Sequence, residues 1–132
     1  MSTVAAALVT LDEFFEMPAP EDGAHLELHD GEVVVVNPSR PIHLYIQQVL
    51  MRWLINTAGE RGSAHSEFPY RPAANLQFWY ADVAYIPAGD WQALRGQHYP
   101  IYAPPLVVEV LSPSNRVQKL NRQRVAAFSA GT

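Results

Sequence analysis

The stretch PPLVVEVLSPSNRVQKLNRQR, residues 104–124, decides how this chain is interpreted. An apolar run from Leu106 to Leu111 is interrupted once, by Glu109, and a short loop then leads into a basic segment with the only lysine, Lys119. Burying an isolated carboxylate is costly unless it is paired or bound to a metal. We therefore interpret Glu109 as an inward-facing ligand or base at the end of a strand. The alternative is a half-exposed strand with Glu109 on its solvent side.

A second lone carboxylate strengthens the first interpretation. Asp82 stands alone in the strand-like run FWYADVAYI, residues 78–86, and lies 27 positions before Glu109. If the two strands are neighbours, the carboxylates form a hard oxygen site that suits Mg²⁺ or Mn²⁺. His65 and Glu67, by contrast, are interpreted as surface residues of another strand.

Length and composition indicate a single domain. The chain has 132 residues, of which 48% are apolar and 17% charged, and this is ordinary globular composition rather than disorder. It has no cysteine, so disulfides and thiolate metal sites are excluded. Residues 1–9 are interpreted as a flexible leader before a domain over 10–132. No run reaches the length of a membrane span, and we expect a cytoplasmic protein.

Charge is distributed unevenly along the chain. All 13 acidic residues lie at or before Glu109, so residues 1–109 carry a net charge of −8 and residues 110–132 a net charge of +4. The basic segment is either a solvated helix face or a local patch for phosphate groups. Its arginines are Arg116, Arg122 and Arg124.

Periodicity and breakers predict the order α-β-β-α-β-β-β-α, which is a mixed α/β fold with helices packed on one sheet. Helices are expected over 10–17, 41–58, 90–94 and 116–130, and strands in 25–37, 63–71, 76–86 and 106–111. Asp30-Gly31 predicts the turn of a hairpin. The long helix carries an apolar face with residues spaced three to four apart, made of Ile42, Ile46, Val49, Leu50, Trp53 and Leu54. The chain stops where a helix normally leads to another strand, so we expect a C-terminally truncated domain.

These motifs together resemble a known family. LELHDGEVVVV, PIHLYIQQVL, YADVAYI and VVEVLSPSN…KLNRQR…SAGT are similar to the Uma-two family of restriction endonucleases, a branch of the PD-(D/E)XK nuclease superfamily. The resemblance implies a restriction-endonuclease-like core and metal-dependent hydrolysis of DNA phosphodiesters. It places Asp82 and Glu109 on the aspartate and glutamate that hold the metal. Ala81 departs from the usual proline before the aspartate.

The catalytic lysine is less clearly placed. Leu111 stands where the superfamily motif has its lysine, and in this family that lysine appears on the following helix. Lys119 is our candidate, and Gln123 lies one turn later at the position closest to the family's lysine. The resemblance also offers Glu27 and His43 as supporting residues. Without it, Glu27 is an ordinary hairpin charge and His43 a structural hydrogen-bonding group.

The resulting hypothesis is an endonuclease in which Asp82 and Glu109 hold Mg²⁺ or Mn²⁺ and Lys119 assists the attacking water. Arg116, Arg122 and Arg124 would contact DNA phosphates, which positions DNA without reading its sequence. A homodimer is compatible with the sequence. One alternative is an inactive remnant of this fold that binds nucleic acid or protein. Another is a fold that a strand from a partner chain completes.

Overall fold

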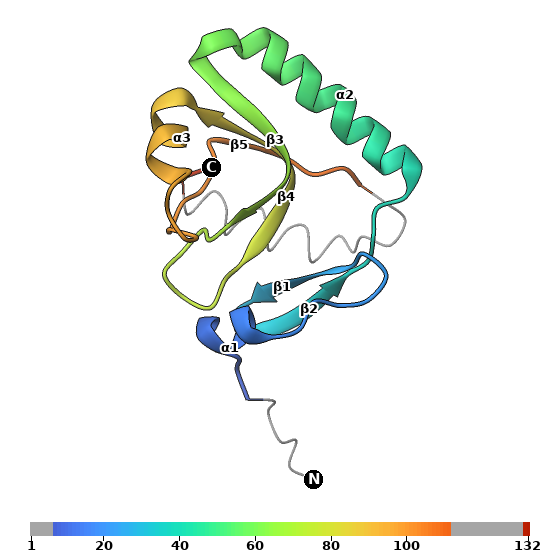
Figure 1. The fold of residues 1–132 in the computed structure, drawn as a ribbon, viewed down its shortest axis with the longest axis vertical. Coiled ribbons are helices and arrows are strands. Elements are labelled where there is room, and N and C mark those ends of the chain that lie inside the picture. Colours follow the sequence, from blue (N-terminus) through green and yellow to red (C-terminus); the bar gives the residue numbers. More distant parts are fainter. Residues whose placement is uncertain (1–6, 112–130) are drawn as a thin grey trace.

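The computed structural model describes residues 7–111 and 131–132. Its elements are α1 (Leu11–Glu16), β1 (His25–His29), β2 (Glu32–Val36), α2 (Pro41–Ala58), η1 (Gly59–Arg61), β3 (Gly62–Tyr70), β4 (Trp79–Pro87), α3 (Ala88–Leu94) and β5 (Leu106–Val108) (Figure 1). This order agrees with the predicted mixed α/β class. The helix predicted over 116–130 lies outside the described residues.

The strands form two ladders, where a single sheet was predicted. β1 and β2 form an antiparallel hairpin, and β3-β4-β5 form an antiparallel three-stranded sheet. One bridge, between Leu28 and Phe78, connects the hairpin to the segment before β4. The predicted strand over 76–86 therefore begins late, at Trp79, because residues 76–78 pair with the hairpin instead of β3.

The predicted hairpin turn is present at Asp30-Gly31. Both residues have positive φ, 51° and 84°, which is the geometry of a two-residue turn that matches the twist of the strands. Two independent constraints, one steric and one conformational, require a glycine at position 31. A Cβ there would meet Leu76 and Leu8 at 2.9 Å, and the backbone conformation disfavours other residues.

The long helix, α2, packs on one face of the three-stranded sheet. Leu50, Met51 and Leu54 contact a cluster of Ala64, Val83 and Val108 from the three strands. The helix bounds were predicted correctly, but the predicted apolar face packs on the sheet only in part, at Leu50 and Leu54. Ile42, Ile46, Val49 and Trp53 are exposed, whereas Gln47 is buried. The helix is turned so that His43 and Gln47 approach the sheet, because both contact Asp82 there.

Two further clusters of buried residues complete the core, and one consists of Tyr70, Trp79, Ala81 and Ala84. His65 follows Ala64 in β3 and so faces away from α2, and its ring lies 4.3 Å from that of Trp91 in α3. Phe14 of α1 packs with Leu28 and Phe78, which fixes the hairpin against the segment before β4. In the part of the chain that the structure describes, no helix is long and apolar enough to cross a membrane.

Candidate active site

Asp82 lies in the middle of β4 and is held by two neighbouring elements. Gln47 of α2 donates from Nε2 to Asp82 Oδ1 at 3.2 Å, and the backbone N–H of Val110 donates to Oδ2 at 2.7 Å. His43 Nε2 lies 3.3 Å from the same Oδ2. Three contacts from α2 and the segment after β5 therefore fix the orientation of one carboxylate.

Glu109 is the first residue after β5 and lies beside Asp82. The ladder pairs Val83 with Val108 and Ala84 with Val107, and the same register continued by one step places Glu109 opposite Asp82. Residues directly opposite each other in an antiparallel pair have side chains on the same face. β5 was predicted to extend to Leu111 but ends at Val108, because Val110 N–H bonds to the Asp82 side chain instead of a strand.

Desolvation and the charge of Asp82 raise the pKa of Glu109 from its ordinary 4.5 to about 9. The residue as a whole is nevertheless exposed, so the desolvation of its carboxyl group is incomplete. The direction of the shift holds in either case, since two carboxylates at one site cannot both ionise freely. The pair consequently favours one shared proton or one cation.

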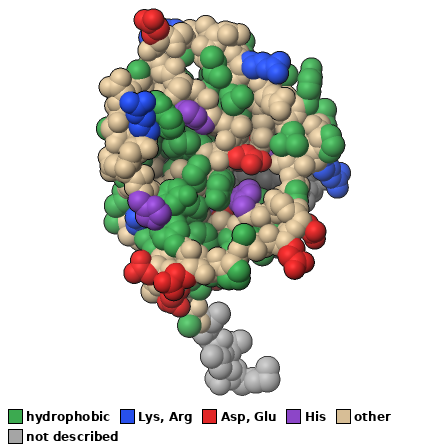
Figure 2. Space-filling model, viewed as in Figure 1, with side chains coloured by type: hydrophobic (Ala, Val, Ile, Leu, Met, Phe, Trp, Pro, Cys, Tyr) green, Lys and Arg blue, Asp and Glu red, His purple; other side chains and the backbone are tan. Residues whose placement is uncertain are grey.

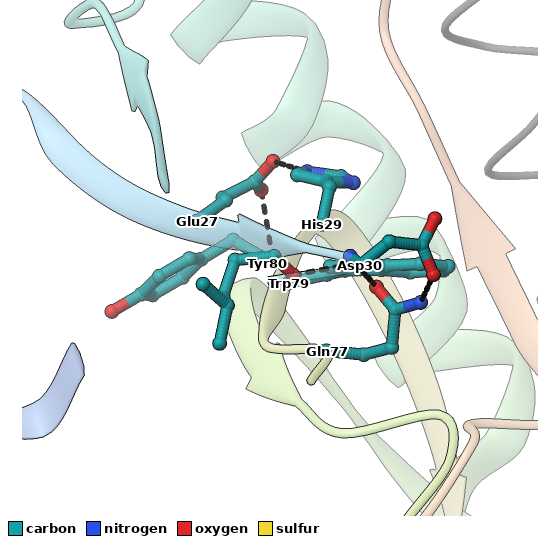
Figure 3. A network of polar contacts seen from close by, with 7 residues as sticks. Glu27, His29, Asp30, Gln77, Trp79 and Tyr80 are labelled. Atoms are coloured by element: carbon teal, nitrogen blue, oxygen red, sulfur yellow. Dashed lines mark hydrogen bonds and ion pairs between the residues drawn. The ribbon is translucent and has the colours of Figure 1, made fainter. Parts of the chain in front are cut away.

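Glu27 joins the hairpin to β4 and is not an ordinary hairpin charge. It is only 4% exposed. Its Oε2 accepts a 2.9 Å hydrogen bond from the backbone N–H of Tyr80, and its Oε1 lies 2.8 Å from His29 Nε2 (Figure 3). Its charge contributes to the raised pKa of Glu109, so Glu27 lies close to the carboxylate pair.

The same network positions the start of β4. The indole Nε1 of Trp79 lies 3.1 Å from Leu28 O and 3.1 Å from Gln77 Oε1, and the ring of His29 stacks on Trp79 (Figure 3). Gln77 in turn accepts a 3.0 Å hydrogen bond from Asp30 N–H. These contacts order the chain up to Tyr80, two residues before Asp82.

His43 lies in the first turn of α2 and contacts the site with one ring nitrogen. Its Nε2 is 3.1 Å from Val110 O as well as 3.3 Å from Asp82 Oδ2, whereas its Nδ1 is buried without a partner among the described residues. A protonated Nε2 would donate to both oxygens. His43 therefore has the contacts of a structural hydrogen-bonding group, and they converge on the candidate metal ligand.

Two contributors were missed in the sequence. Gln47 lies four residues after His43, so the two share a face of α2, and this spacing is the signal that could have found it. Tyr70 ends β3, and burial together with the charges of Glu109 and Glu27 raises its pKa. No sequence pattern marked Tyr70, because its proximity to the carboxylates depends on how the strands pair.

Other predicted residues fall outside the described part of the chain. These are Lys119, Gln123, Arg116, Arg122 and Arg124. Among residues 7–111 and 131–132, no three His, Asp or Glu side chains gather as a metal-binding group. What the structure brings together is a pair of carboxyl groups with Glu27 nearby.

The pair fits a hard divalent cation. Its donors are carboxylate oxygens, and Asp82 has lone pairs left after its hydrogen bonds from Gln47 and Val110. The raised pKa of Glu109 is the second indication, because a cation would relieve the repulsion that causes it. Mg²⁺ is typically held by one or two carboxylates and completes its shell with water and phosphate oxygens, so two protein carboxylates suffice.

Comparison with known proteins gives the family. The model of the Uma2 family, described as "Putative restriction endonuclease", matches residues 11–129. The chain belongs to this family. The resemblance inferred from the sequence motifs is thereby confirmed, and Asp82, Glu109 and their partners all lie within the matched region.

One solved structure agrees with the fold of this Uma2 chain. It is a crystal structure described as "a putative nuclease belonging to DUF820", from Anabaena variabilis. The match has a TM-score of 0.79 at 19% sequence identity and covers 94% of this chain and 70% of the other. At this identity the likeness establishes the fold alone. A search of curated proteins finds no significant match.

Proposed function

We propose that this chain is a metal-dependent endonuclease that hydrolyses phosphodiester bonds in DNA. The observation that carries the proposal is the Asp82–Glu109 pair, two carboxyl groups from neighbouring antiparallel strands, one of which has a strongly raised pKa. Membership of the Uma2 family supports the same reaction class. A structural ion pair does not explain the pair, because both partners carry negative charge when ionised.

Asp82 and Glu109 would hold one Mg²⁺ or Mn²⁺ ion. Such an ion, when bound, polarises a phosphate oxygen and lowers the pKa of a coordinated water. Gln47 and the Val110 N–H keep the Asp82 carboxylate in one orientation, which reduces the reorganisation that binding requires. His43 would hold the Val110 carbonyl and Asp82 in register. Glu27 would support the pair from the hairpin side.

The basic residues after Leu111 remain sequence-based parts of the proposal. Lys119 is proposed to lie by the attacking water and the developing negative charge, with Gln123 as the other candidate position. Arg116, Arg122 and Arg124 are proposed to bind flanking phosphates. A homodimer also stays a prediction. The exposed apolar side chains of α2, among them Ile42, Tyr45 and Trp53, are where self-association would be tested first.

A thermal-melt titration with Mn²⁺ tests the metal site directly. A cation that binds only the folded chain raises the melting temperature according to RT ln(1 + [L]/Kd). We expect Mn²⁺ to stabilise the wild type and not Asp82→Asn. Glu32→Gln is the matched control, because Glu32 is an exposed carboxylate of the hairpin and should leave the Mn²⁺ effect unchanged.

Cleavage of plasmid DNA then tests the reaction. We expect nicking or linearisation in Mg²⁺ or Mn²⁺ that EDTA stops and Asp82→Asn abolishes. DNA binding without any metal-dependent cleavage, together with a melting temperature indifferent to Mn²⁺, would replace this proposal by the inactive binding remnant.

A further inference from the structure

The second half of β4 alternates regularly between the two faces of the three-stranded sheet. Ala64 of β3 and Val83 of β4 pack together under α2. Ala84, the next residue of β4, is paired with His65, whose ring lies against Trp91 of α3. Because neighbouring side chains of a strand point to opposite faces, Val83 lies on the α2 face and Ala84 on the α3 face.

The first half of β4 has the opposite phase. Trp79 and Ala81 pack in one cluster with Ala84, so these three residues share the α3 face. Ala81 and Ala84 are three positions apart, and a regular strand would place them on opposite faces. The alternation of β4 is therefore reversed once, at Asp82 and Val83.

The same reversal occurs in β3. Ala64 lies on the α2 face and Tyr70 on the α3 face, although they are six positions apart and a regular strand would place them together. Phe68 and Tyr70 line a cavity of about 400 Å³, here called the aromatic cavity, together with Trp91 of α3 and Tyr102. The second half of β3 therefore faces α3, and the reversal lies between Ala64 and Phe68.

The reversal coincides with a strained residue in β3. Glu67 has a φ of 49°, in the left-handed region that is rare for residues other than glycine. Between Gly62 and Tyr70 the ladder with β4 lacks one pair, the one that Glu67 would form with Asp82. Such backbone strain costs free energy and persists only where the surrounding structure holds it. The contacts of Asp82 with α2 and with the Val110 N–H are the interactions that hold it.

The reversal turns Asp82 toward α2. Gln47 donates from Nε2 to Asp82 Oδ1 at 3.2 Å, and His43 Nε2 lies 3.3 Å from Oδ2. If β4 kept the phase set by Val83, the Asp82 side chain would point to the α3 face and neither contact would form. The side chain is 22% exposed and so remains open to a ligand. In the space-filling view, acidic and histidine side chains reach the surface among hydrophobic ones (Figure 2).

We propose that Glu67 is a positioning residue, whose left-handed backbone reverses the strand alternation and thereby aims Asp82 at α2. Irregular positions of this kind, like β-bulges, often lie next to active sites and re-aim a side chain. The inference rests on the proposed function for the role of Asp82 and names the backbone feature that directs this ligand. The Glu67 side chain is exposed, so its conformation and not its charge is what matters.

Glycine and valine at position 67 separate these two contributions. Glycine adopts a positive φ without strain, whereas a β-branched residue such as valine strongly disfavours it. Glu67→Gly should therefore keep the reversal, and Glu67→Val should remove it. Ser66→Gly and Ser66→Val are the matched controls, because Ser66 is the exposed neighbouring residue, pairs regularly with Val83 and has no positive φ.

The side-chain amide of Gln47 reports the direction of Asp82 without metal. We would record its NMR signal in EDTA for each variant, with Asp82→Ala as the reference for a lost acceptor. We expect the wild-type signal in Glu67→Gly and in both Ser66 variants, and the Asp82→Ala signal in Glu67→Val. A purely structural cost of valine would lower stability without moving this signal, and would overturn the inference.

Urea denaturation gives a second readout that does not depend on the valine variant being folded. Glycine inside a strand is ordinarily destabilising, so Ser66→Gly should lower the urea midpoint. Glu67→Gly should raise it, because glycine relieves the strained φ. Equal losses in the two glycine variants would contradict the inference.

Calorimetric titration with Mn²⁺ connects the backbone to the proposed metal site. Glu67→Val should weaken Mn²⁺ binding about tenfold, whereas Glu67→Gly and Glu67→Gln should bind as the wild type does. Weaker binding by Glu67→Gln would make the carboxylate itself a ligand and would exclude the backbone role.

Failure of this inference and failure of the proposed function give different results. An unmoved Gln47 signal in Glu67→Val would overturn the inference and leave the Mn²⁺ effect on the wild type intact. A wild type indifferent to Mn²⁺ would overturn the metal site and leave the Gln47 result intact.

Discussion

Replacing Glu109 by glutamine should stabilise the metal-free protein. The substitution keeps the size of the side chain but removes a carboxyl group whose pKa the fold raises from 4.5 to about 9. A raised carboxyl pKa means that the folded chain holds a proton that the unfolded chain releases. Its contribution to stability is complete below about pH 4.5 and is lost as the pH rises to about 9.

The size of the effect follows from that shift. At 1.36 kcal/mol per pKa unit, an unscreened shift of this size would lower the free energy of unfolding by about 3 kcal/mol at pH 7. Because Glu109 is exposed, solvent screening reduces this to about 1 kcal/mol. Glu109→Gln should therefore be about 1 kcal/mol more stable than the wild type at pH 7.

Urea denaturation in EDTA measures the difference, at about pH 5 and about pH 8. The wild type should lose stability relative to Glu109→Gln between these values, and added Mn²⁺ should stabilise the wild type alone. Parallel pH dependences of the two proteins would refute the coupling between Glu109 and Asp82. Mn²⁺ stabilisation of both proteins would refute Glu109 as a ligand.

Three further substitutions test the scaffold around the pair. Gln47→Leu removes the amide that orients Asp82 and should weaken Mn²⁺ binding about tenfold by calorimetry; unchanged affinity would exclude an orienting role. Gly31→Ala should cost about 2 kcal/mol in urea unfolding, whereas Gly89→Ala, whose Cβ meets nothing within 4 Å, should be neutral or stabilising. Leu28→Ala should cost about 3 kcal/mol, because its side chain is fully buried; a near-zero change would mean that the hairpin packs loosely.

Local signals in the sequence were sufficient to predict much of the fold. Asp30-Gly31 predicted the hairpin, because few sequences accept two consecutive residues with positive φ. The bounds of α2 followed from the breakers on either side of it. Asp82 and Glu109 were conspicuous as single carboxylates in apolar runs, and the structure pairs the two strands that carry them.

What the sequence did not reveal depends on partners far along the chain. The inward face of α2 includes His43 and Gln47, which meet Asp82, so only Leu50 and Leu54 of the predicted apolar face reach the sheet. β5 ends early because a side chain takes the N–H of Val110. Tyr70 and the aromatic cavity arise only when β3, α3 and the segment after α3 come together.

The placement of His43 and Gln47 on α2 restricts how chains of this family can change in length. Their contacts to Asp82 and the packing of Leu54 on the sheet are made by one continuous helix. One residue inserted between Gln47 and Leu54 would rotate the two ends relative to each other by about 100°. Either the Asp82 contacts or the core contact would then be lost. We expect homologous chains to vary in length over residues 37–40, before the helix begins, and to keep the number of residues from His43 to Leu54 unchanged.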